Sequence, residues 1–345
     1  MKVLVWLSWG VDSAVAAYLL QQEWHDVVAW FMKNYTSDSW NCTTYNDSVE
    51  AIKVAEFLWI KIQAFDFQDE YQERIIDYIF EGYKKWITPN PDVLCNSLIK
   101  FDVFLEKALE QWFDKIATGH YAQIEEKNWV YHLIRWVDEN KDQSYFLSWL
   151  TQFQLQHAMF PIWWLIKPEV RDLAEKIWLP NAKRRDSQGL CFIWNVPIKN
   201  FLMQKFPPKK WEIRDLDWKI IGEHDWAYYF TIGQKHWLWL NFKAYVYRID
   251  IKNNIVYVCD KESDELYSQD ILVKDWHWIA EEYKEWDHLN WKIRYRQNPP
   301  VWCEISWIDW NDINIHFDNK QWAVAPWQVF VLYDWNVCLG NWIIS

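Results

Sequence analysis

The chain has 345 residues, 24 % of them charged, and a formal net charge of −12, a size typical of two or three domains. This charge content, without any run of eighteen apolar residues, argues against disorder and against membrane-spanning helices. A strand-like run follows Met1 directly with no signal peptide, so we expect a cytoplasmic protein. In that reducing compartment six cysteines are too few for a disulfide scaffold.

The first half of the chain alternates strand and helix patterns. Strands are predicted over residues 2–7, 26–31, 61–66 and 114–118, and helices over 12–22, 47–58, 69–83 and 96–111. Strands separated by such helices predict an α/β domain whose parallel sheet has helices on both faces. Ligands of such sheets bind at the carboxyl ends of the strands.

The second half has a different character from about residue 195. Short alternating runs predict antiparallel strands at 244–251, 255–259, 291–296, 313–317 and 329–333. We therefore expect three domains: the α/β domain over 1–195, a small mostly-β domain over 196–265, and a C-terminal β-barrel over 266–345.

Glycine and tryptophan counts are abnormal in opposite directions. There are 7 glycines and 31 tryptophans, whereas glycine usually makes up roughly 7 % of a chain. Several tryptophans end helix-like runs or follow Asp between strand-like runs, where glycine is typical because the backbone turns left-handed; they are Trp24, Trp59, Trp112, Trp178, Trp218, Trp310 and Trp335.

One substitution process would explain both counts. We hypothesise that a stop-type codon, read as glycine in the source, has been translated as tryptophan. The alternative is a protein that is truly rich in tryptophan. Trp276, Trp278 and Trp322 lie in strand-like or aromatic contexts and are candidates for genuine tryptophans.

Residues 7–13 (LSWGVDS) lie between the first predicted strand and the first predicted helix. Small residues let backbone N–H groups approach an anion, and the helix N-terminus adds positive potential, so the segment predicts a phosphate cradle. Ser8 and Ser13 supply hydroxyl donors, and Asp12 is suited to capping the helix or holding Mg²⁺. The segment lacks the ending of a Walker loop and resembles the pyrophosphatase-type (PP) loop of adenylating enzymes. An indole at Trp9 would fill the phosphate space; the other interpretation of the segment is an ordinary turn.

Further segments resemble the tRNA-specific 2-thiouridylase family from residue 2 to about 343. They follow one another in the family's order and spacing at 31–34, 88–96, 117–121, 141–147, 186–193, 222–224, 231–234, 294–296 and 325–328. Tryptophans also stand where the family has glycine, at positions 6, 9, 163, 164, 194, 237, 239 and 327.

The resemblance implies a PP-loop domain similar to adenine nucleotide alpha-hydrolases, and an enzyme that thiolates tRNA. ATP, with Mg²⁺, would activate the C2 oxygen of the wobble uridine as an adenylate, and a protein persulfide would deliver sulfur. The family's nucleotide-binding positions correspond here to Trp6, Leu7, Ser8, Trp9, Gly10, Val11, Asp12, Ser13, Met32 and Gly119.

Two cysteines match the family's sulfur pair. The resemblance makes Cys191 the persulfide carrier and Cys95 the partner nucleophile, which would close a disulfide to release the sulfur. We expect Cys95 to precede a helix whose N-terminal potential lowers the thiol pKa. We expect Cys191 to lie beside the basic residues 183–185.

The remaining family positions concern RNA. Asn90, Pro91 and Asp92 match a segment that touches the flipped target base, where Asp92 is a possible acid or base, or simply a turn former. Positions that contact tRNA correspond to His120, Lys141, Asp142, Gln143, Arg294, Tyr295 and Gln328.

The acidic net charge opposes RNA binding in general. Residues 181–220, however, contain nine Lys or Arg and four Asp or Glu, a local charge of +5 that favours tRNA. The expected partners are tRNA and a persulfide donor, a cysteine desulfurase or a relay protein, with no membrane. No clustered Cys or His predicts a metal site.

Two alternatives stay open. One is an adenylating enzyme of the same loop class that uses an amine nucleophile and needs no cysteine pair. The other is a catalytically inactive tRNA-binding protein, if Trp9 is genuine.

Overall fold

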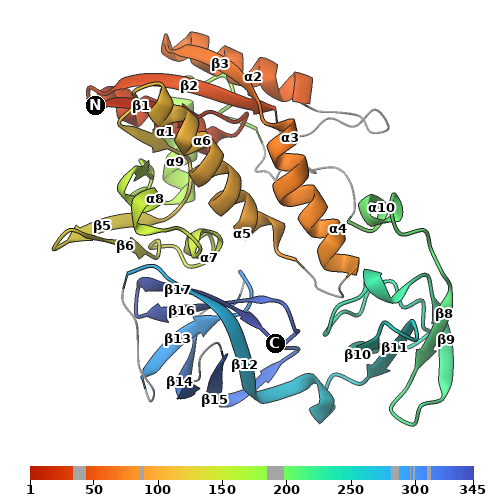
Figure 1. Cartoon of the computed structure of the whole chain (residues 1–345). Coiled ribbons are helices and arrows are strands. Elements are labelled where there is room, and N and C mark those ends of the chain that lie inside the picture. Colours follow the sequence, from red (N-terminus) through yellow and green to blue (C-terminus); the bar gives the residue numbers. More distant parts are fainter. Residues whose placement is uncertain are drawn as a thin grey trace.

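The computed structural model describes residues 1–33, 44–84, 89–184, 198–280, 287–295, 297, 300–308 and 312–345 (Figure 1). Its first sheet is parallel and has the order β3-β2-β1-β4-β7, as predicted for the first domain. The strands are β1 (Lys2–Trp6), β2 (Asp26–Lys33), β3 (Lys61–Asp66), β4 (Lys115–Ala117) and β7 (Ala158–Met159).

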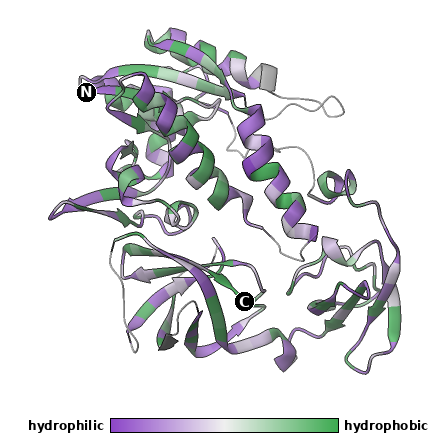
Figure 2. Cartoon of the chain, in the orientation of Figure 1, coloured by the Kyte–Doolittle hydropathy of each residue, from purple (hydrophilic) through white to green (hydrophobic). Residues whose placement is uncertain are grey.

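Helices cover both faces of this sheet because β1 buries alternate side chains on opposite sides. Val3 and Val5 belong to a core shared with α1, α2 and α9, whereas Leu4 and Trp6 belong to the core under α4 and α6. The helices are α1 (Val11–Gln22), α2 (Thr44–Leu58), α3 (Gln68–Tyr71), α4 (Asp77–Lys84), α5 (Pro91–Cys95), α6 (Phe104–Glu110), α7 (Ser144–Leu147), α8 (Gln152–Gln156) and α9 (Lys167–Lys176). Hydrophobic and hydrophilic residues alternate along α4 and α6 (Figure 2).

Two long helical stretches of this domain contain π-helical turns. Gln72–Ile76 joins α3 to α4, and Asn96–Val103 joins α5 to α6. The helix predicted over 96–111 therefore begins earlier, at Pro91, because the Asn90 side chain accepts a hydrogen bond from Val93 N at 3.3 Å and caps it.

A small antiparallel-rich sheet with the order β10-β11-β8-β9 follows the first domain. Its elements are α10 (Ile198–Met203), β8 (Trp211–Arg214), β9 (Ile220–His224), β10 (Tyr245–Asp250) and β11 (Ile255–Cys259), with β8 and β11 parallel to each other. This confirms a mostly-β unit after the parallel sheet.

The C-terminal part is a closed antiparallel barrel, in which β12 pairs with both β15 and β17. Its strands are β12 (Tyr267–Trp278), β13 (His288–Lys292), β14 (Val301–Ile308), β15 (Asp312–Trp322), β16 (Val329–Asp334) and β17 (Val337–Ile344). The barrel confirms the predicted class, although the strand predicted over 291–296 lies earlier, in β13.

A hairpin of the first domain extends the barrel's sheet. Strands β5 (Gln123–Lys127) and β6 (Val130–Ile134) pair with each other, and β6 also pairs with β17. The sequence patterns did not predict this hairpin. It joins the first and last parts of the chain in one sheet (Figure 1).

Ten tryptophans among the described residues have a left-handed backbone, with φ between 52° and 69°. They include all the described positions predicted from helix ends and Asp-Trp turns; the complete set is Trp24, Trp59, Trp112, Trp129, Trp178, Trp218, Trp237, Trp239, Trp327 and Trp335. This conformation costs a side-chain-bearing residue roughly 1–2 kcal/mol and costs glycine almost nothing. The backbone prediction is confirmed at these sites, and Trp310 lies outside the described residues.

Most of these left-handed tryptophans gain little from burial. Trp24, Trp59 and Trp129 are each at least 90 % exposed, whereas Trp30, in the extended backbone of β2, is fully buried. Trp276, Trp278 and Trp322 have no positive φ, in line with their interpretation as genuine tryptophans. These differences support the glycine hypothesis at the left-handed positions.

Candidate functional site

The predicted phosphate loop lies at the carboxyl end of β1, the middle strand of the parallel sheet. Strands β2 and β3 lie on one side of β1, and β4 and β7 on the other, so the loop stands where such sheets bind ligands. The Ser8 and Ser13 hydroxyls lie 3.0 Å apart, and Gly10 N donates to Ser8 Oγ at 3.1 Å. The twelve-residue helix α1 starts immediately after this turn and directs its N-terminus toward it.

Gly119, just after the neighbouring strand β4, packs directly on the loop. A Cβ at this position would lie 2.6 Å from Ser13 N and 2.7 Å from the Asp12 carbonyl carbon, closer than atoms can approach. Met32 is buried at the end of β2. Both residues lie at the carboxyl edge of the sheet, where the resemblance implies nucleotide contacts, and those contacts stay a prediction.

Lys167 adds a cation to the loop that the sequence analysis missed. Its Nζ lies 2.6 Å and 2.8 Å from the two carboxylate oxygens of Asp12. Tyr121 donates its hydroxyl to the same carboxylate at 2.6 Å. Lys167 opens helix α9, far from Asp12 in the sequence, so only the fold brings them together. With a lysine, an N-terminal helix turn and two hydroxyls, the loop suits a phosphate ligand.

Trp6, the last residue of β1, and Trp9, within the loop, are held differently from the left-handed tryptophans. Trp6 is buried edge-on against Phe104, with ring centroids 5.3 Å apart. The Arg184 guanidinium lies 4.3 Å from the centre of the Trp9 ring, and Asn181 donates to the Trp9 carbonyl at 3.1 Å. Neither tryptophan has a positive φ, so the case for glycine at position 9 rests on the space a phosphate needs, not on the backbone.

Cys95 is a buried residue at the end of α5. The prediction that it precedes a helix is wrong, because the helix already begins at Pro91. The potential of a helix N-terminus fades within the first turn, so it acts on Cys95 less than we expected. Asp92 lies nearer that N-terminus and is partly exposed. Cys191 and Arg185 belong to residues 185–197, which lie outside the described residues. The persulfide role of Cys191 therefore stays a prediction.

His120 lies inside the first domain. Its Nδ1 is 2.7 Å from Thr118 Oγ1, and its ring is 5.9 Å from those of Phe101 and Phe160. Burial, aided by the charge of Lys100, holds the pKa of His120 well below its ordinary value. The neutral, buried imidazole thus serves packing in this structure, and its contact with tRNA stays a prediction.

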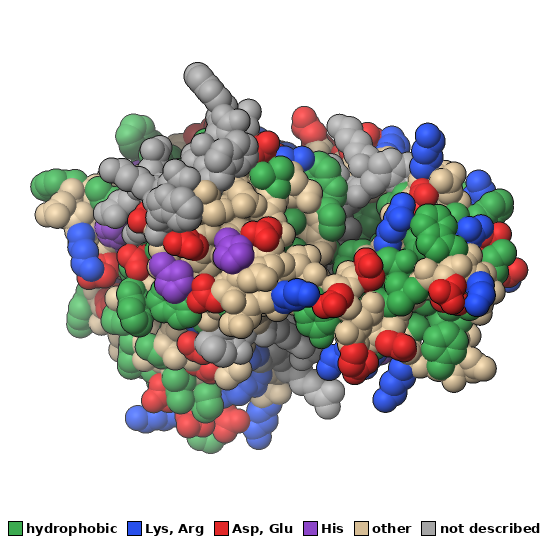
Figure 3. Space-filling view, turned by 90° about the horizontal axis from the view of Figure 1, so that it is seen from below, with side chains coloured by type: hydrophobic (Ala, Val, Ile, Leu, Met, Phe, Trp, Pro, Cys, Tyr) green, Lys and Arg blue, Asp and Glu red, His purple; other side chains and the backbone are tan. Residues whose placement is uncertain are grey.

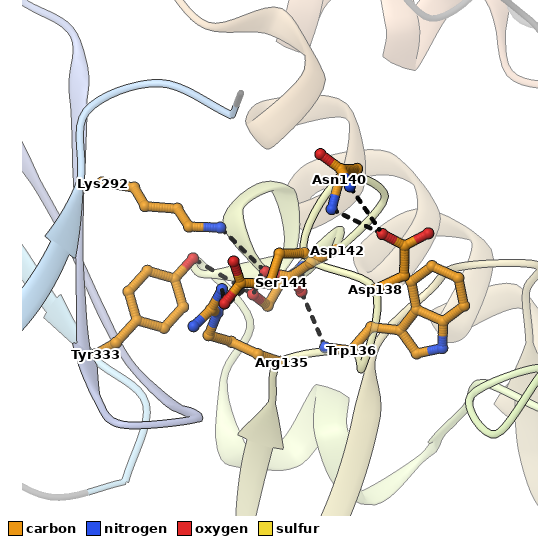
Figure 4. A network of polar contacts seen from close by, with 9 residues as sticks. Arg135, Trp136, Asp138, Asn140, Asp142, Ser144, Lys292 and Tyr333 are labelled. Atoms are coloured by element: carbon orange, nitrogen blue, oxygen red, sulfur yellow. Dashed lines mark hydrogen bonds and ion pairs between the residues drawn. The ribbon is translucent and has the colours of Figure 1, made fainter. Parts of the chain in front are cut away.

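Asp142 is completely buried, although the resemblance implies a tRNA contact there. Its carboxylate accepts hydrogen bonds from Trp136 N and Ser144 N, both at 3.1 Å (Figure 4). Arg135 and the barrel residue Lys292 also bind it, at 3.4 Å and 3.3 Å. In this structure the side chain is an internal anchor, while its neighbours Lys141 and Gln143 remain partly exposed.

The resemblance implies RNA contacts at three residues of the barrel, Arg294, Tyr295 and Gln328. The Tyr295 ring packs on Phe146 with centroids 4.5 Å apart. Arg294 donates to the Ala323 carbonyl, and its guanidinium lies 5.2 Å from the Trp322 ring. Gln328 hydrogen-bonds Ile344 through its backbone. Their roles toward RNA stay predictions.

Charge is dispersed over the face seen in Figure 3, where acidic and basic side chains are interspersed. The positive excess predicted over 181–220 is only partly described, because 185–197 are not. Within the described ranges we find no group of three or more His, Cys, Asp or Glu arranged to hold a metal. Nor does any described helix combine the length and apolarity needed to cross a membrane.

Comparison with known proteins decides the family. The model of the tRNA methyl transferase HUP domain matches residues 1–195, more than half of the chain. A tRNA methyl transferase PRC-barrel domain matches 199–260, and an aminomethyltransferase beta-barrel domain matches 268–344. The tRNA-specific 2-thiouridylase of Methylobacillus flagellatus is 41 % identical over 100 % of this chain and 98 % of its own length. The chain belongs to the tRNA-specific 2-thiouridylase family.

Other 2-thiouridylases match equally well. The enzyme of Nitrosomonas europaea is 41 % identical and covers 99 % of this chain and 98 % of its own length. Among solved structures, a U34-tRNA thiolase from Methanococcus maripaludis is 21 % identical, covering 60 % of this chain and 67 % of its own, with a TM-score of 0.38. The family model and the two 2-thiouridylases confirm the resemblance read from the sequence motifs, and with it the PP-loop class of the first domain.

Proposed function

We propose that this chain is the sulfurtransferase that its family membership indicates, an enzyme that converts a uridine of tRNA to 2-thiouridine at the expense of ATP. The observation that carries the proposal is the 41 % identity to a tRNA-specific 2-thiouridylase over the whole chain. The phosphate loop at the centre of the sheet supports it, because its geometry suits the pyrophosphate part of a nucleotide.

The first chemical problem is the C2 oxygen of uridine, which is a poor leaving group. Transfer of AMP from ATP to this oxygen converts it to a good one and releases pyrophosphate. The α1 N-terminus and Lys167, which lies 2.6 Å from Asp12, would stabilise the departing pyrophosphate. Once Lys167 binds the phosphates, the Asp12 carboxylate would be available for the Mg²⁺ that accompanies ATP.

The second step forms the carbon–sulfur bond. The terminal sulfur of a persulfide on Cys191 attacks C2, and AMP leaves with the former uridine oxygen. Cys95 thiolate then attacks the Cys191 sulfur, which closes a disulfide and releases the thiolated base. A cysteine desulfurase or a relay protein would supply the persulfide, and an external thiol would reduce the disulfide. Asp92 is placed by the resemblance at the target base as a possible acid or base.

The proposal is tested by incubating the protein with unmodified tRNA, ATP, Mg²⁺ and a persulfide donor, and by measuring 2-thiouridine in the digested tRNA. Cys95→Ser and Cys191→Ser should both abolish the product. Cys259→Ser, at a buried cysteine of β11, is the matched control and should retain activity. Full activity in both sulfur-pair variants would favour the amine-using alternative.

The residue at position 9 is a separate question with its own test. A peptide mass spectrum over residues 3–19 of the protein from its source distinguishes glycine from tryptophan. We expect glycine, and we expect Trp9→Gly in the recombinant chain to strengthen ATP binding measured by calorimetry. Tryptophan in the native peptide, together with no ATP binding, would favour an inactive tRNA-binding protein.

A further inference from the structure

The barrel holds one segment of the first domain through a buried ion pair. Asp142, between β6 and α7, and Lys292, at the end of β13, are both fully buried and lie 3.3 Å apart. Arg135 and the Tyr333 hydroxyl complete the cluster: Arg135 Nε lies 3.4 Å from Asp142, and the Tyr333 hydroxyl lies 3.3 Å from Ser144 Oγ (Figure 4). Burying an unpaired charge is costly, so the Asp142 carboxylate and the two cations must stay close to one another.

Other contacts fix the same segment to the barrel. The Tyr145 hydroxyl lies 3.0 Å from the Val329 carbonyl oxygen and 3.3 Å from that of Ile293. The Phe146 ring packs on Tyr295. The barrel therefore determines where residues 142–146 lie.

This segment also touches the candidate site at both of its ends. Gln143 exchanges two hydrogen bonds of 2.8 Å with the backbone of Tyr121, whose hydroxyl binds the phosphate-loop residue Asp12. The Phe146 carbonyl accepts a hydrogen bond of 3.2 Å from Asn96, which directly follows Cys95. The segment thus spans from the phosphate loop to the nucleophile.

We propose that Asp142 and Lys292 are positioning residues for the thiolation reaction: through residues 142–146, the barrel sets the geometry between the phosphate loop and Cys95. This rests on the proposed function. Because neither side chain is exposed, their charges act through the protein and not through contact with RNA. The barrel then contributes to the rate of the chemistry besides any share in tRNA binding.

The physical argument is geometric. The segment has no long helix or strand of its own, since α7 is a four-residue turn. Its position depends on the Asp142 carboxylate, which gathers two backbone N–H groups of the first domain and a lysine of the barrel. Loss of the lysine removes the barrel's hold on this carboxylate. Small displacements of reacting groups lower rates steeply, about a hundredfold for 1 Å.

The test compares Lys292→Met and the pair Asp142→Asn/Lys292→Met with wild type. The asparagine keeps an oxygen for the two backbone N–H groups, so the pair variant removes charge without stripping the turn. Lys320→Met is the matched control, because Lys320 is an exposed barrel lysine 2.9 Å from Asp264. Measured quantities are the single-turnover rate of 2-thiouridine formation and the tRNA dissociation constant.

We expect both test variants to react at least about tenfold more slowly, while the tRNA dissociation constant stays within about twofold. A second readout is independent of activity: alkylation of Cys95, followed by peptide mass spectrometry, should accelerate relative to Cys259 of the middle domain. A global loss of stability would accelerate both cysteines alike.

An unchanged rate in Lys292→Met, or a rate loss fully explained by weaker tRNA binding or by equal acceleration at both cysteines, would overturn the inference. Inactive wild type under the same conditions would instead count against the proposed function. The two failures are therefore distinguishable.

Discussion

Two lysine–aspartate pairs connect distant parts of this chain, and they differ chiefly in their access to solvent. In the phosphate loop, the Lys167 and Asp12 side chains are 10 % and 29 % exposed. Under the barrel, the Lys292 and Asp142 side chains are both 0 % exposed. The first pair is open on one side, so a phosphate or a divalent cation can replace one partner. The second is closed, so it acts only through the protein structure. The same kind of ion pair thus belongs to the candidate site in the phosphate loop and to a structural contact between domains under the barrel.

The open pair should matter for chemistry and little for stability. Lys167→Met removes a cation beside the departing pyrophosphate, and we expect pyrophosphate release to fall by about 10²–10³-fold, the usual loss for one charge-stabilising donor. Lys176→Met, at the exposed end of the same helix, is the control. Wild-type pyrophosphate release from Lys167→Met would show that the open pair is only structural.

The closed pair should matter for stability first. Asp142→Leu leaves Lys292 buried without its carboxylate, and breaking a buried pair in this way costs about 3–5 kcal/mol of unfolding free energy. Urea unfolding measures this loss. Asp264→Leu, which breaks the exposed pair with Lys320, serves as the comparison and should leave the midpoint unchanged. Equal midpoints for the two variants would contradict the contrast.

Exposure should also decide the effect of replacing tryptophans. Trp178→Gly relieves a left-handed backbone at an 82 % exposed side chain, so we expect a gain of about 1 kcal/mol. Trp30→Gly removes a fully buried ring stacked on Phe65, so we expect a loss of about 3–5 kcal/mol. Thermal unfolding of the two variants checks both signs, and a loss at Trp178 would count against the glycine hypothesis.

His120 shows what burial does to a titratable side chain that has no carboxylate partner among the described residues around it. Its pKa is well below the ordinary value when folded, so the unfolded chain alone takes up a proton as the pH falls below about 6.5. The contribution of the neutral His120 to the free energy of unfolding is therefore complete above that pH. Below it, this contribution falls by about 1.4 kcal/mol per pH unit. Urea unfolding of wild type and His120→Gln between pH 5 and 7 measures the difference, and parallel curves would refute it.

Local patterns were sufficient to predict much of the fold. The strands at 61–66 and 255–259 were predicted to the residue, since uninterrupted apolar or alternating runs determine them. The hairpin β5–β6 was missed because its turn is Asn128-Trp129. Both residues have a positive φ, and with glycine at 129 the pair would be the strongest short signal for a hairpin. The tryptophan conceals that signal.

The site was predictable where its residues are neighbours in the sequence and not elsewhere. The phosphate loop is one contiguous segment, and its position after β1 was anticipated. Lys167 and Lys292 bind partners 155 and 150 residues away, and no periodicity indicates such a pairing. The motif predicted that Asp142 contacts tRNA, whereas the side chain is buried against the barrel residue Lys292.

The shared sheet of the hairpin and the barrel also orders events during synthesis. Leu133 and Ile134 pair with Cys338 and Val337, so the partner of β6 is synthesised about 200 residues after it. Until then, the first domain carries an unpaired strand edge, which is prone to associate with other chains. Synthesis of β17 is therefore the event that covers this edge of the first domain, and a product lacking β17 would expose the edge permanently.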